Sequence, residues 1–412
     1  MKKIKIPLIA ALAIGIAFSA CQNESQEAAS ANTADEAAVA KLLDRNERIR
    51  YDKEWDQVQN YYVKFREAIQ KEEDDAKDRL AMADLFINEA RITGEHGHYY
   101  PAALEVLAGI PESHPDKDIR FRKLSTQASV ELSLHDFQKA LKTAEAAVAI
   151  NPYNAQIYGA LVDANVELGH YEEAVKMADK MVSIRPDMRS YARVSYLREI
   201  HGQVEGALEA MQLAVDAGYP GYEATAWARL TLGEMYERYG MLKEAEAQYN
   251  IILAEREDYP FAIASLANLE MGRGNYEKAE QMLKDACEII PEFGFYEQLA
   301  EIYKTTGRTA EFEATMDELW VMLKDDTDSG HDMSLEYANL YSDLSGEQEK
   351  ALEYALGEYE KRPANIDVNR VLAKIYSRMG KVDEATAHLQ KAQATNAKYP
   401  ELDELKQQLA SR

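Results

Sequence analysis

YNAQIYGALVDANVELGHYEEAVKMADKMVSIRP, residues 153–186, is the stretch that decides the fold, because its pattern recurs along most of the chain. Apolar residues follow one another at helical intervals in each of its halves, which places them on one face of each segment. Gly169 between the halves can end a helix in the left-handed conformation, and Pro186 cannot continue the second helix. The stretch therefore predicts two helices joined by a tight turn.

Three kinds of residue recur in register with this stretch. Small alanines recur mostly at intervals of 33 or 34 residues, turn glycines keep the same spacing, and prolines close several of the second helices. They are Ala140, Ala174, Ala207, Ala245, Ala279, Ala351 and Ala385; Gly169, Gly202, Gly240, Gly274, Gly307, Gly346 and Gly380; and Pro152, Pro186, Pro291 and Pro363. A fixed period of this length indicates stacked helical hairpins, so we expect an all-α solenoid.

These residues resemble the tetratricopeptide repeat, a helix-turn-helix unit with small residues where its two helices touch and a proline at its end. The resemblance covers residues 80–400 and implies a right-handed superhelical solenoid. His135 stands in place of a turn glycine and Phe312 in place of a small alanine, so two units depart from the pattern. Segments beginning at Ile87, Val162 and Ser190 also resemble a family of bacterial repeat proteins, for which the resemblance implies no activity.

Composition divides the chain into five segments. We expect a signal peptide at 1–20, a flexible tether at 21–36, a helical cap with an irregular repeat at 37–120, the solenoid at 121–399 and a closing helix at 400–412. The first segment has lysines before an apolar run, as secretory signals do. The tether has no large apolar side chain and cannot bury a core. The cap carries an apolar seam from Trp55 to Ile69 at helical spacing.

Residues 18–21, FSAC, resemble a bacterial lipobox, which implies that Cys21 is acylated and becomes the new N-terminus. Each buried methylene would contribute ~0.8 kcal/mol to membrane binding. A plain signal peptide cleaved near Ala20 is the alternative. Because Gln22 is not the aspartate associated with inner-membrane retention, we expect a lipid anchor in the outer membrane of a bacterial envelope. Cys287 then has no disulfide partner in the chain.

The charge and the absence of known motifs argue against nucleic-acid binding, catalysis and metal binding. The net charge of −25 disfavours nucleic acid as a partner. The sequence has no phosphate-binding glycine loop, no GxSxG nucleophile elbow and no HExxH metal motif. His96, His98 and His114 lack the spacing of metal ligands on a helix, and we interpret them as turn and helix-end residues. We therefore predict that the protein is not an enzyme and needs no cofactor or metal.

The resemblance implies that the first helices of the repeats line a concave groove. Carried over to this sequence, the groove positions include Arg189, Tyr196, Glu199, Trp227, Glu234, Arg238, Arg370, Lys374 and Arg378. We expect a protein or peptide partner to bind there. A glycan- or nutrient-capturing surface lipoprotein is the alternative, although such proteins build their site from long insertions and here the units follow one another almost without gaps.

Two groups of these predicted groove residues each allow a binding role and a purely structural one. Tyr196 and Trp227 could anchor a partner, as aromatic residues often do, or could pack against neighbouring repeats. Arg370, Lys374 and Arg378 are spaced four apart and form a basic stripe. The stripe could clamp a carboxylate through charge-assisted hydrogen bonds, or it could be a solvated face paired with nearby acids.

Overall fold

The computed structural model describes residues 39–51, 53–71 and 75–411, and every regular element in these ranges is helical. This confirms the predicted all-α fold class. The predicted signal peptide, the lipidation site Cys21 and the tether lie outside the described residues.

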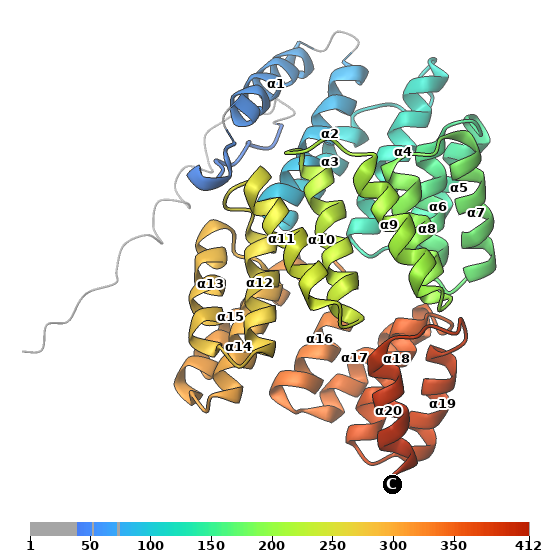
Figure 1. The fold of residues 1–412 in the computed structure, drawn as a ribbon. Helices are drawn as coiled ribbons and strands as arrows, with labels where there is room; N and C mark the ends of the chain where they lie inside the picture. Colours follow the sequence, from blue (N-terminus) through green and yellow to red (C-terminus); the bar gives the residue numbers. More distant parts are fainter. Residues whose placement is uncertain (1–38, 52, 72–74, 412) are drawn as a thin grey trace, which may run out of the picture. The chain divides into compact units, whose positions relative to one another are not determined.

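Helix pairs follow one another along the described chain (Figure 1). A 3-10 turn η1 (Glu47–Ile49) and helix α1 (Lys53–Gln70) precede the pairs. The pairs are α2 (Ala76–Thr93) with α3 (His96–Ala108), α4 (Lys117–Ser133) with α5 (Phe137–Ile150), α6 (Ala155–Glu167) with α7 (Tyr171–Ile184), α8 (Met188–Ile200) with α9 (Val204–Asp216), α10 (Glu223–Arg238) with α11 (Leu242–Glu255), α12 (Pro260–Gly272) with α13 (Tyr276–Ile289), α14 (Phe293–Thr305) with α15 (Thr309–Asp328), α16 (Ser334–Leu340) with α17 (Gln348–Lys361), and α18 (Ile366–Arg378) with α19 (Val382–Ala392). A π-helical turn η2 (Tyr341–Ser345) continues α16, and α20 (Pro400–Ala410) follows the last pair.

The stretch that decided the fold forms α6 and α7, as predicted. The side-chain oxygen of Asn154 accepts a hydrogen bond from the backbone N–H of Gln156 (2.9 Å) and caps the start of α6. Gly169 adopts a φ of +79°, and the N–H of His170 donates to the carbonyl of Asn165 (2.7 Å). This left-handed turn ends α6 and sends the chain into α7.

The periodic alanines mark the contact between the two helices of each pair. All seven are fully buried, with an exposed fraction of 0%, which confirms that the helices meet at these positions. His135, which replaces a turn glycine, adopts the same left-handed conformation with a φ of +62°. Phe312, which replaces an alanine, is half-buried and packs against buried residues of α13, α14 and α15.

The first helices of the pairs lie on the inner side of the array. Neighbouring first helices touch one another directly, α2 with α4, α4 with α6, α6 with α8, and α10 with α12. Second helices other than α15 pack mainly against their own partner and the element that follows, whereas α15 packs against α14 and also contacts α3. Elements on the concave side of a curved stack approach each other most closely. We therefore call the surface formed by the first helices the inner face.

The second half of the array packs against the first half along a seam. The N–H of Asp332 donates to the carbonyl of Leu134 (3.1 Å), and the Nδ2 of Asn365 donates to the carbonyl of Glu167 (2.9 Å). These bonds join the turns after α4 and α6 to the loops before α16 and α18 (Figure 1). We call the contact between these turns and loops the seam.

The residues before α1 connect two distant parts of the array. Arg45, which is fully buried, donates to the carboxylate of Glu89 in α2 at 2.8 and 2.6 Å. Arg48 donates to Asp285 in α13 (2.7 Å), and the Nδ2 of Asn46 donates to the carbonyl of Glu288 (2.7 Å). Removing one partner from a buried ion pair costs ~3–5 kcal/mol, so the pair of Arg45 and Glu89 holds this segment in place.

Candidate interaction face

Three of the predicted groove residues lie on α8 in different environments. Arg189 stands in the first turn and is exposed. Tyr196 is half-buried, and burial raises the pKa of its hydroxyl well above the usual range. The carboxylates of Asp367 and Glu167 raise that pKa further. Tyr196 packs against a buried cluster that includes Ile366 of α18, so it lies beside the seam. Glu199, near the end of α8, is buried.

Glu199 and Arg238 bind each other across adjacent repeats. The guanidinium of Arg238 donates to the Glu199 carboxylate, which also accepts a hydrogen bond from the Tyr239 hydroxyl (3.1 Å). The Arg238 guanidinium lies over the ring of Tyr399, 5.6 Å from its centroid. Both predicted groove charges therefore have partners within the protein.

Helix α10 presents an open surface between these charges and the next repeat. Trp227, Thr231 and Glu234 follow at helical spacing on one face, and 47% of Trp227 is exposed. One turn further, Glu237 accepts a hydrogen bond from Asn268 of α12 (2.5 Å), which places this face on the inner side. Glu234 stays open to water, but the surrounding protein reduces its hydration and raises its pKa to about 7.

The basic stripe on α18 is neutralised by neighbouring acids. Arg370 donates to Glu401 (2.6 Å), and Lys374 donates to Asp343 (2.8 Å). Arg378 also donates to Asp343. These ion pairs fit the alternative of a solvated face paired with nearby acids. Capture of a partner by the stripe stays a prediction.

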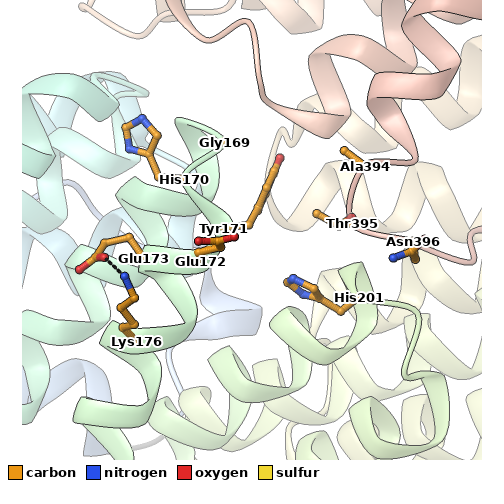
Figure 2. A pocket seen from close by; sticks show the side chains of 10 residues that line it. All are labelled: Gly169, His170, Tyr171, Glu172, Glu173, Lys176, His201, Ala394, Thr395 and Asn396. Atoms are coloured by element: carbon orange, nitrogen blue, oxygen red, sulfur yellow. Dashed lines mark hydrogen bonds and ion pairs between the residues drawn. The ribbon is translucent and has the colours of Figure 1, made fainter.

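A pocket of about 580 Å³ lies where the α6–α7 turn faces the loop between α19 and α20. Figure 2 shows the residues that line this pocket. One wall comes from the α6–α7 turn and α7, and includes the ion pair of Glu173 with Lys176 (2.9 Å). His201 and the loop residues 394–396 form the other side. The hydroxyl of Thr395 is buried and finds no hydrogen-bond partner among the described residues. Because the walls come from distant parts of the chain, no local sequence pattern predicted this pocket.

A second pocket, of about 610 Å³, lies between the starts of α6 and α8. Gln156 and Arg189 line it together with Tyr153, of which 79% is exposed. The structure therefore places one predicted groove residue, Arg189, in a concave site.

Sequence reasoning missed Arg122 of α4, although the repeat register could have found it. Arg122 lies 34 residues before Gln156, and Gln156 lies 33 residues before Arg189, so the three occupy the same position in successive first helices. Arg91 near the end of α2 was missed as well, and there the irregular repeat provides no clear register.

In the ranges that the structure describes, no group of three or more His, Cys, Asp or Glu side chains is arranged to hold a metal ion. No helix in the same ranges is both long enough and apolar enough to cross a membrane.

Models of the tetratricopeptide repeat match residues 131–198 and 262–290. A curated relative, the small glutamine-rich tetratricopeptide repeat-containing protein 2 of Saccharomyces cerevisiae, is 27% identical over 136 residues, which are 33% of this chain and 39% of that protein. The matched region thus spans well under half of that relative's length.

Solved structures with low sequence identity also match. A thermophilic tetratricopeptide-repeat protein of Thermus thermophilus is 21% identical, with 47% of this chain and 98% of that chain covered and a TM-score of 0.40. The Cut9–Hcn1 hetero-tetramer of the APC/C gives 14% identity, 87% and 66% coverage, and a TM-score of 0.43.

Proposed function

Since the chain is a tetratricopeptide-repeat protein, we propose that it is a non-catalytic scaffold that binds a protein or peptide partner on its inner face. Arrays of this kind commonly offer extended concave surfaces for binding. The partner would lie as an extended segment or helix along the first helices.

The observation that carries this proposal is the exposed Trp227 on α10. A large aromatic side chain that is 47% exposed on an inner surface leaves apolar area in contact with water. Burying that area against a partner would stabilise a complex by about 25 cal/mol for each Å² removed from water. Glu234, further along the same face with its pKa raised to about 7, adds a carboxyl group whose charged form a cationic group of the partner would stabilise.

We further propose that the scaffold is held on a bacterial envelope membrane through an acylated Cys21. The sequence of residues 18–21 and the polar tether after it support this location. Mass spectrometry of the N-terminal peptide from native cells would identify a diacylglyceryl group on Cys21, and an unmodified or differently cleaved N-terminus would contradict it.

Photo-crosslinking in the native cell tests the proposed binding. A photoreactive amino acid at Trp227 should yield a discrete protein adduct that mass spectrometry can identify. The matched control is Ala247, which is exposed on the second helix α11. Equal labelling at both positions, or no adduct at Trp227, would contradict binding on the inner face.

A further inference from the structure

The seam repeats one contact, between the turn inside a helix pair and a loop that lies six helix pairs further along the chain. The turn of α2–α3 meets the loop before α14, since a Cβ on Gly94 would lie 3.4 Å from the carboxylate of Glu292. The turn of α4–α5 meets the loop before α16 through the bond between Leu134 and Asp332. The turns of α6–α7 and α8–α9 meet the loops before α18 and α20. Four successive contacts therefore follow one geometric relation.

On the turn side, the residue two places after the turn reaches across the seam. The hydroxyl of Tyr171, two residues after Gly169, accepts a hydrogen bond from the N–H of Ile366 (2.7 Å). Phe137 holds the same position in the preceding pair, and the guanidinium carbon of Arg362 lies 4.7 Å from its ring centroid. A large side chain at this position is therefore part of the contact.

On the loop side, an asparagine that caps the next helix makes the contact. Asn365 caps α18, and its Nδ2 donates across the seam to the carbonyl of Glu167 (2.9 Å). Asn154 follows a proline at the same distance and caps α6 in the same way. Its Nδ2 donates to no residue that the structure describes. The loop before α6 therefore carries the same donor in an unused state.

The loops before α6, α8 and α10 form a free and apolar border of the array. We call this border, which consists of residues 151–154, 185–187 and 217–222, the loop edge. Tyr153, Tyr219 and Tyr222 on it are 79%, 77% and 68% exposed, more than any other large apolar side chain in the described parts of the chain. Residues of all three loops also line the pocket of about 610 Å³.

The later loops are already covered within the molecule. The seam covers those before α14, α16, α18 and α20. The loop before α12 is covered by the segment that precedes α1, where Arg48 donates to Asp258 and the ring centroid of Tyr51 lies 3.8 Å from the guanidinium carbon of Arg256. The loop edge is thus the part of this border that still lacks a cover among the described residues.

The pairs from α10–α11 onward carry the turn side of the same contact with no loop against it. Leu242 holds the position of Tyr171 in α10–α11 and is 45% exposed. The turn glycines of these pairs have a positive φ and no heavy atom from elsewhere in the described chain within 4 Å of the Cβ position; they are Gly240, Gly274, Gly307, Gly346 and Gly380. We call these turns, with the residue two places after each, the turn edge.

We propose that the loop edge of one copy of this chain packs on the turn edge of a second copy, so that the seam contact is repeated between molecules. The second copy is the occupant because this protein already packs such turns on such loops within itself. The contact removes the exposed tyrosine rings from water, which favours association. Because the two edges differ, the copies join head to tail. The inner face stays open, so this association does not depend on the proposed partner binding.

Sedimentation equilibrium of the purified full chain tests the association. The average mass should rise with protein concentration. The variants Tyr153→Ser/Tyr219→Ser on the loop edge and Leu242→Ser on the turn edge should each weaken association about tenfold, since each removes apolar contact area. Tyr61→Ser on α1 is the matched control, because Tyr61 is 51% exposed and lies on neither edge. A monomer at every concentration, or association that the edge variants weaken no more than the control does, would overturn the inference.

Photo-crosslinking between copies tests which surfaces meet. A photoreactive amino acid replaces Tyr153, and the protein is mixed with an isotopically labelled copy so that crosslinks between molecules are recognised by mass spectrometry. The peptide captured from the other copy should contain a turn of the turn edge, such as the one at Gly240 or Gly274. Capture of the other copy's loop edge, of its inner face or of no second copy would contradict head-to-tail packing.

Discussion

Gly169 serves the turn of its own repeat and the seam at the same time. Its φ of +79° ends α6, and a Cβ at this position would lie 2.6 Å from the carbonyl carbon of Ala364 across the seam. Gly240 has a similar φ of +76° and no heavy atom within 4 Å of its Cβ position. The two glycines therefore share the backbone requirement but not the close approach.

Alanine substitutions should separate these two roles. Gly240→Ala should lower the free energy of unfolding by ~1–2 kcal/mol, the cost of a left-handed conformation with a Cβ. Gly169→Ala should cost a further ~1–3 kcal/mol, because the new methyl group would push the backbone of residue 364 away. Urea denaturation of both variants measures the difference. Equal losses of stability would mean that the backbone at the seam shifts to accommodate the methyl group at little cost.

The turn role of Gly169 could be predicted from the sequence, and its seam role could not. A glycine between two apolar helical patterns signals a helix end by itself. Contact with Ala364 depends on how the intervening repeats bring the second half of the array against the first.

At the scale of the element, the helix pair depends on one small residue. Ala174 of α7 has an exposed fraction of 0%, and the side chains around it leave no room for a longer one. Repeat periodicity was enough to predict this, because the same small residue returns wherever two helices cross closely.

A larger side chain at that position should therefore overpack the pair. Ala174→Leu is expected to lower the free energy of unfolding by ~1–3 kcal/mol. The control, Ala247→Leu on the exposed face of α11, should change it by only a few tenths of a kcal/mol, since both residues favour helix. Thermal and chemical denaturation would measure both, and a neutral result for Ala174→Leu would mean that the helices cross elsewhere.

At the scale of the whole described molecule, the seam gathers three histidines from distant elements. The centroid of the His331 ring lies 6.2 Å from the ring centroid of His96 on α3 and 6.4 Å from that of His135. It lies 5.8 Å from the ring centroid of Tyr100. Its Nδ1 is buried without a hydrogen-bond partner among the described residues. Burial lowers the pKa of His331 to about 4, and the nearby His96 and His135 contribute to that lowering.

This arrangement predicts that His331 contributes less to stability in acid. A histidine in the unfolded chain has a pKa of about 6.5. Between pH ~6.5 and ~4, residue 331 is therefore protonated in the unfolded state but not in the folded state. The contribution of His331 to the free energy of unfolding should fall by ~3 kcal/mol as the pH is lowered through this window. Raised carboxylate pKa values, such as about 7 for Glu297, act in the opposite direction.

The variant His331→Phe isolates the histidine contribution. Urea denaturation at several pH values measures the free energy of unfolding of the variant and of the wild type. As the pH falls from about 6.5 to about 4, the variant should become more stable relative to the wild type. A difference that does not change with pH would show that His331 does not carry the acid sensitivity.

The sequence by itself determined the helical hairpins, their turns and the alanines at their contacts, because each of these follows from residues within one repeat. Only the tertiary structure decided which charges on the inner face are free. Arg238 meets Glu199 and Arg370 meets Glu401, whereas Arg122 and Arg189 pair with no acid among the described residues, although both pairs of arginines look alike as groove positions. The reason is that a groove charge finds a partner only where the packing of a neighbouring helix brings an acid within reach, and the residues within one repeat do not fix that packing.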